Sequence, residues 1–531
     1  MSEQAGEQVF LRKSSGLVKS AGPFDVFVYN FGLISIGIAV TLAHLNIPGN
    51  YAGASIPLAE VAAAVFMACV AWGFWCWSTV IPRSGGVYAF VTRGLSPWLG
   101  FSVSFVDTFT WLFYNALAAT YLTTIGIAPA MFAVGTITAS DSLVRAAVMV
   151  QAPLGQLLIG IAGILVAGLV LARGMRAFFL AQKITLTIAC LGTLACIAVL
   201  AGADHRSFLH LFSSATARYH VQPLQALAAP AGPGSPWSFS ARATLLAAVW
   251  PVLSFVGGIF SINIGGEARN AKRTQLIGMF GSIAVAAAGM VLLSYLGDKV
   301  FGYDFQAGLA AFTASDQAHA FPLSPSFSLL AALATRNALL ALCLCLGFMA
   351  WAFFWIPATI VYATRAMIAW SFDRLAPAKL GFVHPVRHTP VTAIVVAVVA
   401  NVIFLALFLY TPFFGGLVLV LAAMLAWIPT MLGAILFPYR RVEMFKRSAM
   451  AGRRLLGLPT MTVAGVLALI AVCVLTVLLW NDPIAAGHSP QSIGTIAVIF
   501  AIGALWYVAA RALRRRQGLR LERAFAEIPI E

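Results

Sequence analysis

The sequence predicts an all-α protein that crosses a membrane twelve times. Its 531 residues are 61% hydrophobic and only 9% charged, with a mean hydropathy of +0.92. A soluble chain could not bury that much apolar surface. Apolar runs long enough to span a bilayer, about 20 residues each, recur along the whole sequence. The basic residues are also unevenly shared between alternate connections, as in polytopic membrane proteins.

The predicted spans follow one another with short polar connections. They cover roughly residues 24–44, 57–80, 99–125, 154–172, 177–201, 243–264, 276–297, 337–363, 390–410, 414–437, 459–480 and 491–511. The first 23 residues are polar and contain no short apolar segment of a cleavable signal, so the first span is expected to stay as an anchor.

The distribution of charge predicts the orientation. If the N-terminus lies in the cytoplasm, six basic residues fall on outer connections: Arg145, Arg206, Arg218, Arg242, Lys299 and Arg336. The other 27 of the 33 lysines and arginines then lie inside. This asymmetry predicts a cytoplasmic (plasma) membrane protein with both termini in the cytoplasm. The net charge of +16 therefore fits contact with lipid headgroups, and no nucleic-acid-reading motif accompanies it.

Neither cysteine nor histidine predicts a metal centre. All seven cysteines fall in apolar runs, where cysteine behaves as a small hydrophobic residue. His205, His210 and His220 lie in the connection 202–242 without metal-ligand spacing or acidic partners. We expect no disulfide, metal or cofactor, and a solvated outer loop over 202–242.

The sixth span contains the strongest local signal for a site. Gly257 and Gly258 lie in its middle, where each glycine costs a helix about 1 kcal/mol relative to alanine. A break at membrane depth needs an enclosed cavity where a ligand satisfies the freed backbone groups. The carbonyl groups of Phe255, Val256 and Gly258 are thus candidate ligands for an ammonium group.

The first span carries a matching cluster of small residues, Gly32, Ser35 and Gly37. If the helix unwinds there, the N–H groups of Ser35, Ile36 and Gly37 would face a substrate carboxylate. Alternatively, small residues only let a neighbouring helix approach closely. Paired breaks five spans apart are typical of an inverted repeat, which favours the first interpretation.

Three motifs resemble those of the amino acid–polyamine–organocation (APC) permeases. Phe255-Val-Gly-Gly-Ile259, followed by the run from Gly265 to Arg273, resembles the family's sixth-helix signature, with Ala271 in place of the usual proline. Ile81-Pro-Arg-Ser-Gly-Gly-Val-Tyr88 resembles the motif P-x-S/A-G-G-x-Y. The segment Thr364–Val391 resembles the loop after helix eight. The first span matches only in part, since Ile36 replaces a usual small residue.

The resemblance implies a LeuT-type fold, in which helices 1–5 and 6–10 form inverted repeats and two further helices follow. It divides the chain into a cytoplasmic tail (1–23), the first repeat (24–201), the outer connection (202–242), the second repeat (243–437), helices 11–12 (438–511) and a basic cytoplasmic tail (512–531). In the family the last two helices often join subunits, so a homo-oligomer is one option.

Four polar residues are further candidates. Asp107 is an ionisable group inside the third span, and either carries a proton or forms a structural ion pair with Lys183. Asn115 either recognises the substrate or joins helices. Glu267 lies among basic residues at the inner end of the sixth span, which predicts a gate or packing network rather than a substrate contact.

The coupling ion stays open. Some proton-coupled relatives carry a lysine four turns into the fifth helix, where this sequence has Ala189. Sodium coupling would require hydroxyl groups on the eighth span, and Gly347–Pro357 offers none. The sequence thus favours neither H⁺ nor Na⁺.

The resemblance implies a secondary transporter that moves a small amino acid by alternating access. Ile259 stands where some family members have an acid, which argues against a cationic side chain. Trp351, Phe354 and Trp355 either line the cavity or pack against other helices and lipid. A polyamine or other organic cation is the alternative substrate, for which Asp107 would supply a carboxylate. An enzyme is disfavoured, because no nucleophile–base pair or metal-ligand motif is visible, and no ring of carboxylates indicates a channel.

Overall fold

The structure is a computed structural model that describes residues 17–219, 239–313, 321–482 and 488–519, with residues 521 and 525. Twelve helical segments in this part are long and apolar enough to cross a membrane. They coincide with the twelve predicted spans, so the all-α polytopic architecture is confirmed. The only sheet among these residues is a hairpin of two strands with two residues each, β1 (Arg454–Leu455) and β2 (Leu458–Pro459).

The first half of the chain forms five spans and several shorter helices. Its elements are α1 (Pro23–Ile34), α2 (Ile36–Asn46), α3 (Ile56–Val80), α4 (Gly86–Gly94), α5 (Pro97–Tyr121), the π-helical turn η1 (Leu122–Ile127), α6 (Ala128–Ile137), α7 (Asp141–Gln151), α8 (Pro153–Ala172), α9 (Met175–Gly202), α10 (His205–Thr216) and the 3₁₀ turn η2 (Ala217–Tyr219).

The second half adds seven spans. Its elements are α12 (Ala241–Ala247), α13 (Val249–Phe255), the 3₁₀ segments η3 (Val256–Asn263) and η4 (Gly265–Glu267), α14 (Ala271–Leu276), the π-helical turn η5 (Ile277–Gly281), α15 (Ser282–Phe301), α16 (Tyr303–Thr313), α17 (Phe327–Leu333), α18 (Ala338–Phe372), the 3₁₀ turn η7 (Ala378–Gly381), α19 (Val391–Tyr410), α20 (Pro412–Gly415), α21 (Val420–Arg440), α22 (Val442–Lys446), α23 (Thr460–Asn481) and α24 (Pro490–Arg516).

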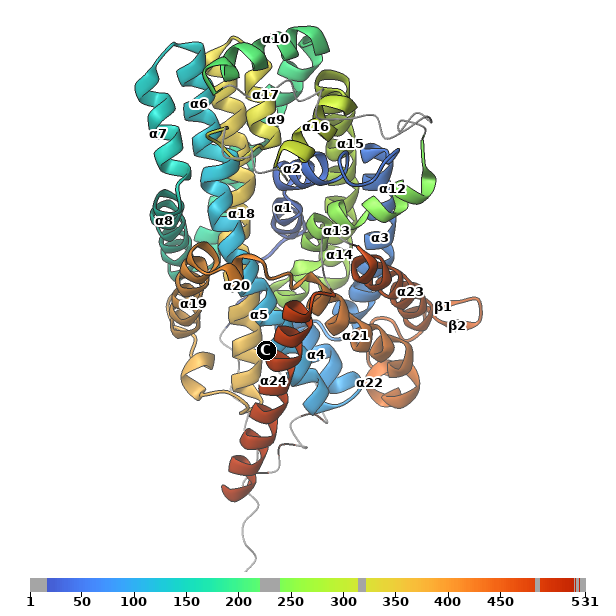
Figure 1. Ribbon diagram of the computed structural model, residues 1–531. Coiled ribbons are helices and arrows are strands. Elements are labelled where there is room, and N and C mark those ends of the chain that lie inside the picture. Colours follow the sequence, from blue (N-terminus) through green and yellow to red (C-terminus); the bar gives the residue numbers. More distant parts are fainter. Residues whose placement is uncertain are drawn as a thin grey trace, which may run out of the picture.

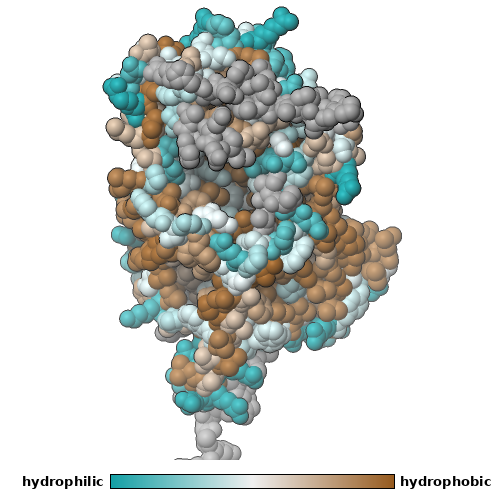
Figure 2. All heavy atoms as spheres, in the orientation of Figure 1, coloured by the Kyte–Doolittle hydropathy of each residue, from teal (hydrophilic) through white to brown (hydrophobic). Residues whose placement is uncertain are grey.

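The spans pack into one helical bundle around α18, which contacts α9 and α5 along much of its length. The short helices α10, α16 and α17 gather at one end of the bundle, and α4 and α22 lie at the other (Figure 1). Apolar side chains cover much of the flank between these ends, while hydrophilic ones gather at the upper end (Figure 2). This distribution is the one a bilayer requires of a spanning protein.

The first span is broken where the sequence predicts it. Ser35 adopts a left-handed conformation with φ 52° and ψ 78°, and separates α1 from α2. A non-glycine residue rarely adopts this conformation, because its Cβ approaches the backbone. Gly22, Asp25 and Pro23 support the start of α1, where the N–H of Gly22 donates to the carboxylate of Asp25 over 2.9 Å. The start of α2 has no side-chain cap within the described chain.

The sixth span changes helix type instead of opening. The α-helix α13 ends at Phe255, and Val256–Asn263 continues as a 3₁₀ segment. Gly257 is required by the close approach of the first span, since a Cβ there would lie 2.3 Å from the carbonyl carbon of Leu33. The break in the first span and the altered segment of the sixth are therefore in direct contact.

Two other segments differ from the expectation. The outer connection is not wholly an irregular loop, because α10 occupies its start, capped by Asp204 and anchored by buried Phe208 and Phe212 one turn apart. His220 lies outside the described residues. The third span is also longer than predicted: Pro97–Ile137 runs through Pro129, which falls at the start of α6 after the π-helical turn.

Candidate functional site

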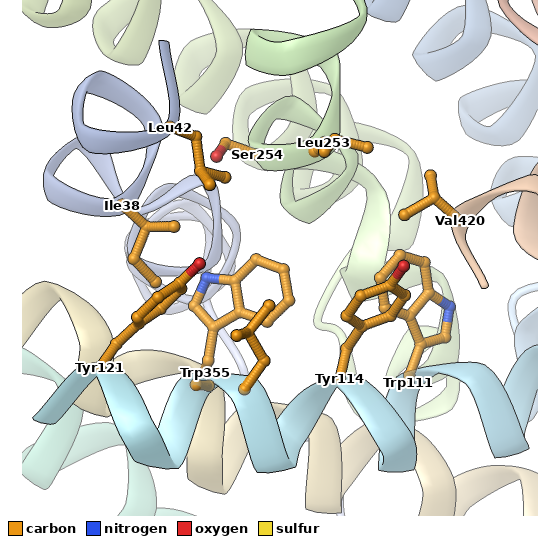
Figure 3. Close-up of a pocket in the computed structure, with 11 residues that line it drawn as sticks. Ile38, Leu42, Trp111, Tyr114, Tyr121, Leu253, Ser254, Trp355 and Val420 are labelled. Atoms are coloured by element: carbon orange, nitrogen blue, oxygen red, sulfur yellow. The ribbon is translucent and has the colours of Figure 1, made fainter. Parts of the chain in front are cut away.

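A small cavity of about 50 Å³ lies beside the broken first span, within the bundle. Its walls come from α2, α5, α13, α18 and α21, and are Ile38, Leu42, Trp111, Tyr114, Leu117, Ala118, Tyr121, Leu253, Ser254, Trp355 and Val420. We call it the aromatic cavity. In Figure 3 the rings of α5 and α18 stand on one side, facing the side chains of α2 and α13 on the other. The cavity therefore lies between the first, third, sixth, eighth and tenth spans.

One face of α5 supplies most of the aromatic lining. Trp111, Tyr114 and Tyr121 are spaced three and seven residues apart, which places them on the same side of an α-helix (Figure 3). Trp111 also packs edge-on against Phe260 of η3, with ring centroids 4.8 Å apart. This packing fixes the cavity wall against the sixth span. The spacing was visible in the sequence, and it is the signal by which these missed residues could have been found.

The cavity contains buried polar atoms that the protein leaves without a partner. In the described part of the chain, the indole nitrogen of Trp355 and the hydroxyl of Ser254 make no hydrogen bond. The hydroxyl of Tyr114, by contrast, accepts from the N–H of Leu419 over 3.0 Å. An unsatisfied buried polar group costs about 1–3 kcal/mol. A ligand or water bound there would recover that free energy.

The predicted backbone residues lie next to this cavity and do not line it. The Ser35 hydroxyl donates to the carbonyl of Trp351 over 3.0 Å. Its backbone N–H, predicted to face a carboxylate, donates instead to the carbonyl of Phe31 over 3.3 Å, because the last turn of α1 closes on it. Gly37 packs against the side chains of Phe348 and Trp351, and the cavity wall begins one residue later at Ile38. On the sixth span the wall ends at Ser254. Phe255, Val256, Gly257, Gly258 and Ile259 follow it and are buried.

Asn115 and two of the predicted aromatic residues have structural contacts. The Asn115 amide donates to the carbonyl of Ile356 over 3.3 Å, which joins α5 to α18 near its internal Pro357. The Trp351 indole donates to Thr193 over 2.9 Å, and Phe354 packs against Gly32. Of the three aromatic candidates on the eighth span, Trp355 lines the aromatic cavity.

The predicted ion pair between Asp107 and Lys183 is wrong. Lys183 pairs with Asp25 at the start of the first span, at 2.7 Å. Asp107 is 2% exposed and accepts from the indole of Trp111 over 3.0 Å and from the hydroxyl of Tyr362. Lys183 could not be assigned from sequence, because Asp25 and Asp107 belong to different spans and each lies in the first half of its span. Asp107 is thus held by neutral donors on α5 and α18.

Glu267 has a different partner from the nearby basic run. Its two carboxylate oxygens accept from Arg365 of α18, from Nε over 2.8 Å and from Nη2 over 3.2 Å. Both side chains are 1% exposed. Backbone hydrogen bonds add to this contact: the N–H of Ala21 donates to the carbonyl of Glu267, and that of Arg269 to the carbonyl of Ala21. The segment before α1 is therefore fastened to the end of the sixth span.

A second buried ion pair lies at the same end. Asp373 accepts from Arg93 of α4 at 2.7 and 3.0 Å and from the hydroxyl of Tyr88 over 2.7 Å. Burial, reinforced by the adjacent carboxylate, raises the pKa of Tyr88 well above its ordinary value, so the tyrosine stays a neutral donor. This network ties the motif after the second span to the motif after the eighth.

A cluster of buried polar side chains at the opposite end of the bundle was not predicted from the sequence. Glu60 of α3 is fully buried, and the hydroxyl of Ser294 donates to it over 2.7 Å. His44 of α2 lies 2.6 Å from the amide oxygen of Gln306 and 3.9 Å from Asp298. No group of three or more metal-ligating side chains occurs in the described residues. The carboxylate in the second span was recognisable from its place in an apolar run, but its partners come from distant helices.

The sequence was compared with known protein families and with curated proteins. The family profile described as "Amino acid permease" matches residues 26–517, which include all twelve spans except the first residues of the first. No curated protein matches the chain. Since the family match covers far more than half of the sequence, the protein belongs to the amino acid permeases of the APC superfamily, transporters of amino acids or related organic cations.

Proposed function

We propose that the protein is a secondary transporter that moves a small neutral amino acid across the cytoplasmic membrane by alternating access. The observation that carries this proposal is the left-handed break at Ser35, which lies against the 3₁₀ segment of the sixth span beside the aromatic cavity. In transporters of this type, helix ends at membrane depth bind the charged groups of the amino acid backbone.

The start of α2 is suited to the substrate carboxylate. The first N–H groups of a helix have no intrahelical partner, and the described chain supplies no side-chain cap here. Ile36 and Gly37 form the first turn, where the helix dipole also favours a negative charge. The carbonyl groups where α13 passes into η3, from Phe255 to Gly258, are the corresponding acceptors for the ammonium group. Asn115 would act by holding α5 against α18 instead of by contacting the substrate.

The aromatic cavity favours an apolar or aromatic side chain. No charged residue lines it, and its polar groups are two tyrosine hydroxyls, one serine hydroxyl and two indole N–H groups. A polyamine would require carboxylates, and Asp107 is enclosed by Trp111 and Tyr362. A cationic substrate is therefore the weaker alternative.

The inner end of the bundle would then act as a closed gate. In this proposal the gate is made by two buried ion pairs, Glu267–Arg365 and Asp373–Arg93, together with the backbone contacts of Ala21. By the distribution of basic residues this end is cytoplasmic. Transport would require the Glu267–Arg365 contact to separate and form again in each cycle. The coupling ion is left open between H⁺ and Na⁺.

The test is thermal unfolding of the purified full-length protein against the standard amino acids and a set of polyamines, with and without sodium. A ligand that binds only the folded state adds about 2.7 kcal/mol of stability at 100 times its dissociation constant. We expect stabilisation by neutral apolar or aromatic amino acids, and uptake of the same compounds by proteoliposomes. Stabilisation by polyamines alone would reject the amino acid assignment.

A further inference from the structure

A second, chemically different cavity lies near the start of α9. It measures about 350 Å³ and is lined mainly by the connection between α8 and α9 and by the loop that precedes α19. Its lining includes Arg173, Gly174, Arg176, Glu267, Arg387 and His388. We call it the basic cavity. It shares no lining residue with the aromatic cavity.

The charge of the basic cavity is unbalanced. Arg173, Arg176 and Arg387 are exposed at its rim, and none of them forms an ion pair with another described residue. The one carboxylate in the lining, Glu267, already receives two hydrogen bonds from Arg365. Three guanidinium groups therefore line a cavity in which the one acid among the described residues, Glu267, is already paired with Arg365. Guanidinium groups bind phosphate oxygens through paired N–H donors.

The backbone at this place adds to the positive potential. Gly174 has φ +111° and precedes the first turn of α9, a helix of 28 residues without a side-chain cap in the described chain. The N–H groups of such a first turn favour an anion. A Cβ at Gly174 would lie 2.9 Å from the carbonyl oxygen of Arg387, so the two walls are in close contact.

The walls are also held together by side-chain hydrogen bonds. Thr389 donates to the carbonyl of Leu171 over 3.0 Å, which joins the loop before α19 to the end of α8. Within that loop, the N–H groups of Val386 and Arg387 donate to the ring of His384 over 3.2 and 3.3 Å. The arginines on the two walls are thus presented by a fixed backbone.

We propose that the basic cavity binds a phosphate-bearing anion, held by Arg173, Arg176 and Arg387. The chemistry is shared by two sources, the headgroup of an anionic phospholipid and a free phosphate in solution. The site shares no lining residue with the aromatic cavity and does not depend on the identity of the transported substrate. Because Glu267 belongs to both the cavity and the buried pair with Arg365, a bound anion would lie against the inner gate.

The experiment compares the wild-type protein with the double variant Arg173→Gln/Arg387→Gln. In detergent, thermal unfolding is measured against inorganic phosphate, with chloride at matched ionic strength as the reference. In nanodiscs of phosphatidylcholine with phosphatidylglycerol, retained anionic lipid is counted by native mass spectrometry. We expect the double variant to bind phosphate about tenfold more weakly, or to retain less phosphatidylglycerol, because two charged donors are lost.

The matched control is Arg440→Gln/Arg447→Gln, which removes two exposed charges from the same side of the bundle without touching the cavity. It should behave as wild type in both arms. A change in the phosphate arm alone identifies a soluble anion, and a change in the lipid arm alone identifies a headgroup. If neither arm distinguishes the double variant from the control, the proposal is overturned. Should the double variant misfold, Arg387→Gln and Arg173→Gln are each measured alone, with the same criteria.

Discussion

The structure buries two candidate carboxylates, Glu267 and Asp107, in opposite ways. Glu267, just after the C-terminal end of the sixth span, is paired through both oxygens with a buried arginine. Asp107, in the third span, is equally buried but is held by an indole and a phenol. The first arrangement fixes a charge where two spans meet. The second surrounds a carboxyl group with neutral donors next to the wall of the aromatic cavity. Burial alone thus does not tell which carboxylate is structural.

The largest effect is expected from Glu267→Gln. This change leaves the guanidinium of Arg365 buried without a counter-charge, which costs about 3–5 kcal/mol in free energy of unfolding. Denaturant unfolding of the purified protein in detergent would measure it. The matched control is Glu443→Gln: Glu443 and Lys446 also form an ion pair, at 3.3 Å, but are 76% and 66% exposed. We expect a change within about 0.5 kcal/mol there. Equal losses would contradict the assigned role of burial.

The next effect concerns the contact between the broken first span and the sixth. Gly257→Ala places a Cβ 2.3 Å from the carbonyl carbon of Leu33, a backbone atom that cannot move aside easily. We expect the free energy of unfolding to fall by about 1–3 kcal/mol and uptake into proteoliposomes to be lost. Gly452→Ala is the control, since a Cβ there meets nothing within 4 Å. Full activity of Gly257→Ala would show that the two spans are not in close contact during transport.

A smaller effect distinguishes binding from structure on the sixth span. Ser254 faces the aromatic cavity without a hydrogen-bond partner among the described residues, whereas Ser261 bonds to Asn30 and Gln275. Ser254→Ala should leave stability unchanged and weaken ligand binding by about 0.5–1.5 kcal/mol. Ser261→Ala should do the reverse, and lower stability by about 1–3 kcal/mol because its two partners lose a bond. For both variants, ligand binding would be measured by calorimetry and the free energy of unfolding would be measured as well. If the two variants change ligand binding and stability by the same amounts, Ser254 is not a ligand-binding residue.

Among the four comparisons of variants, the smallest effect is expected from Asp107→Asn. The amide keeps an acceptor for Trp111 and leaves no buried cation unpaired, so the loss should stay below about 1 kcal/mol. Tyr362→Phe, which removes the other donor, is the companion variant. Unfolding of both variants, followed by uptake at two pH values, would show whether the carboxyl group serves transport. A loss as large as that of Glu267→Gln would mean that Asp107 has a charged partner.

The sequence was sufficient for features that depend on neighbouring residues. Hydropathy over about 20 residues located all twelve spans, because each must be apolar along its length to lie in a bilayer. The small residues around Ser35 predicted the break in the first span, since local backbone freedom is encoded there. The helical extension of the third span past Pro129 was missed, because a π-helical turn, stabilised by packing, precedes the proline.

The candidate site was predicted only in its position along the chain. The nominated residues lie directly beside the aromatic cavity, while the wall itself is made by Ile38, Ser254 and the rings of α5. Which face of a buried helix points inward cannot be read from a span that is apolar on all sides. The one face that could be recognised is that of α5, where Trp111, Tyr114 and Tyr121 share a helical spacing.

The membrane class, the number of spans, the asymmetry of charge and the place of the first break could all be predicted from the sequence. These follow from composition and from contacts within a single helix. The partners of buried groups became known from the folded structure: Arg365 for Glu267, Tyr362 for Asp107 and Asp25 for Lys183. These partners are separated by 98, 255 and 158 residues respectively, and several candidates of equal chemistry exist for each. The choice among them is made by how the helices pack, because a hydrogen bond forms only when donor and acceptor lie within about 3.5 Å.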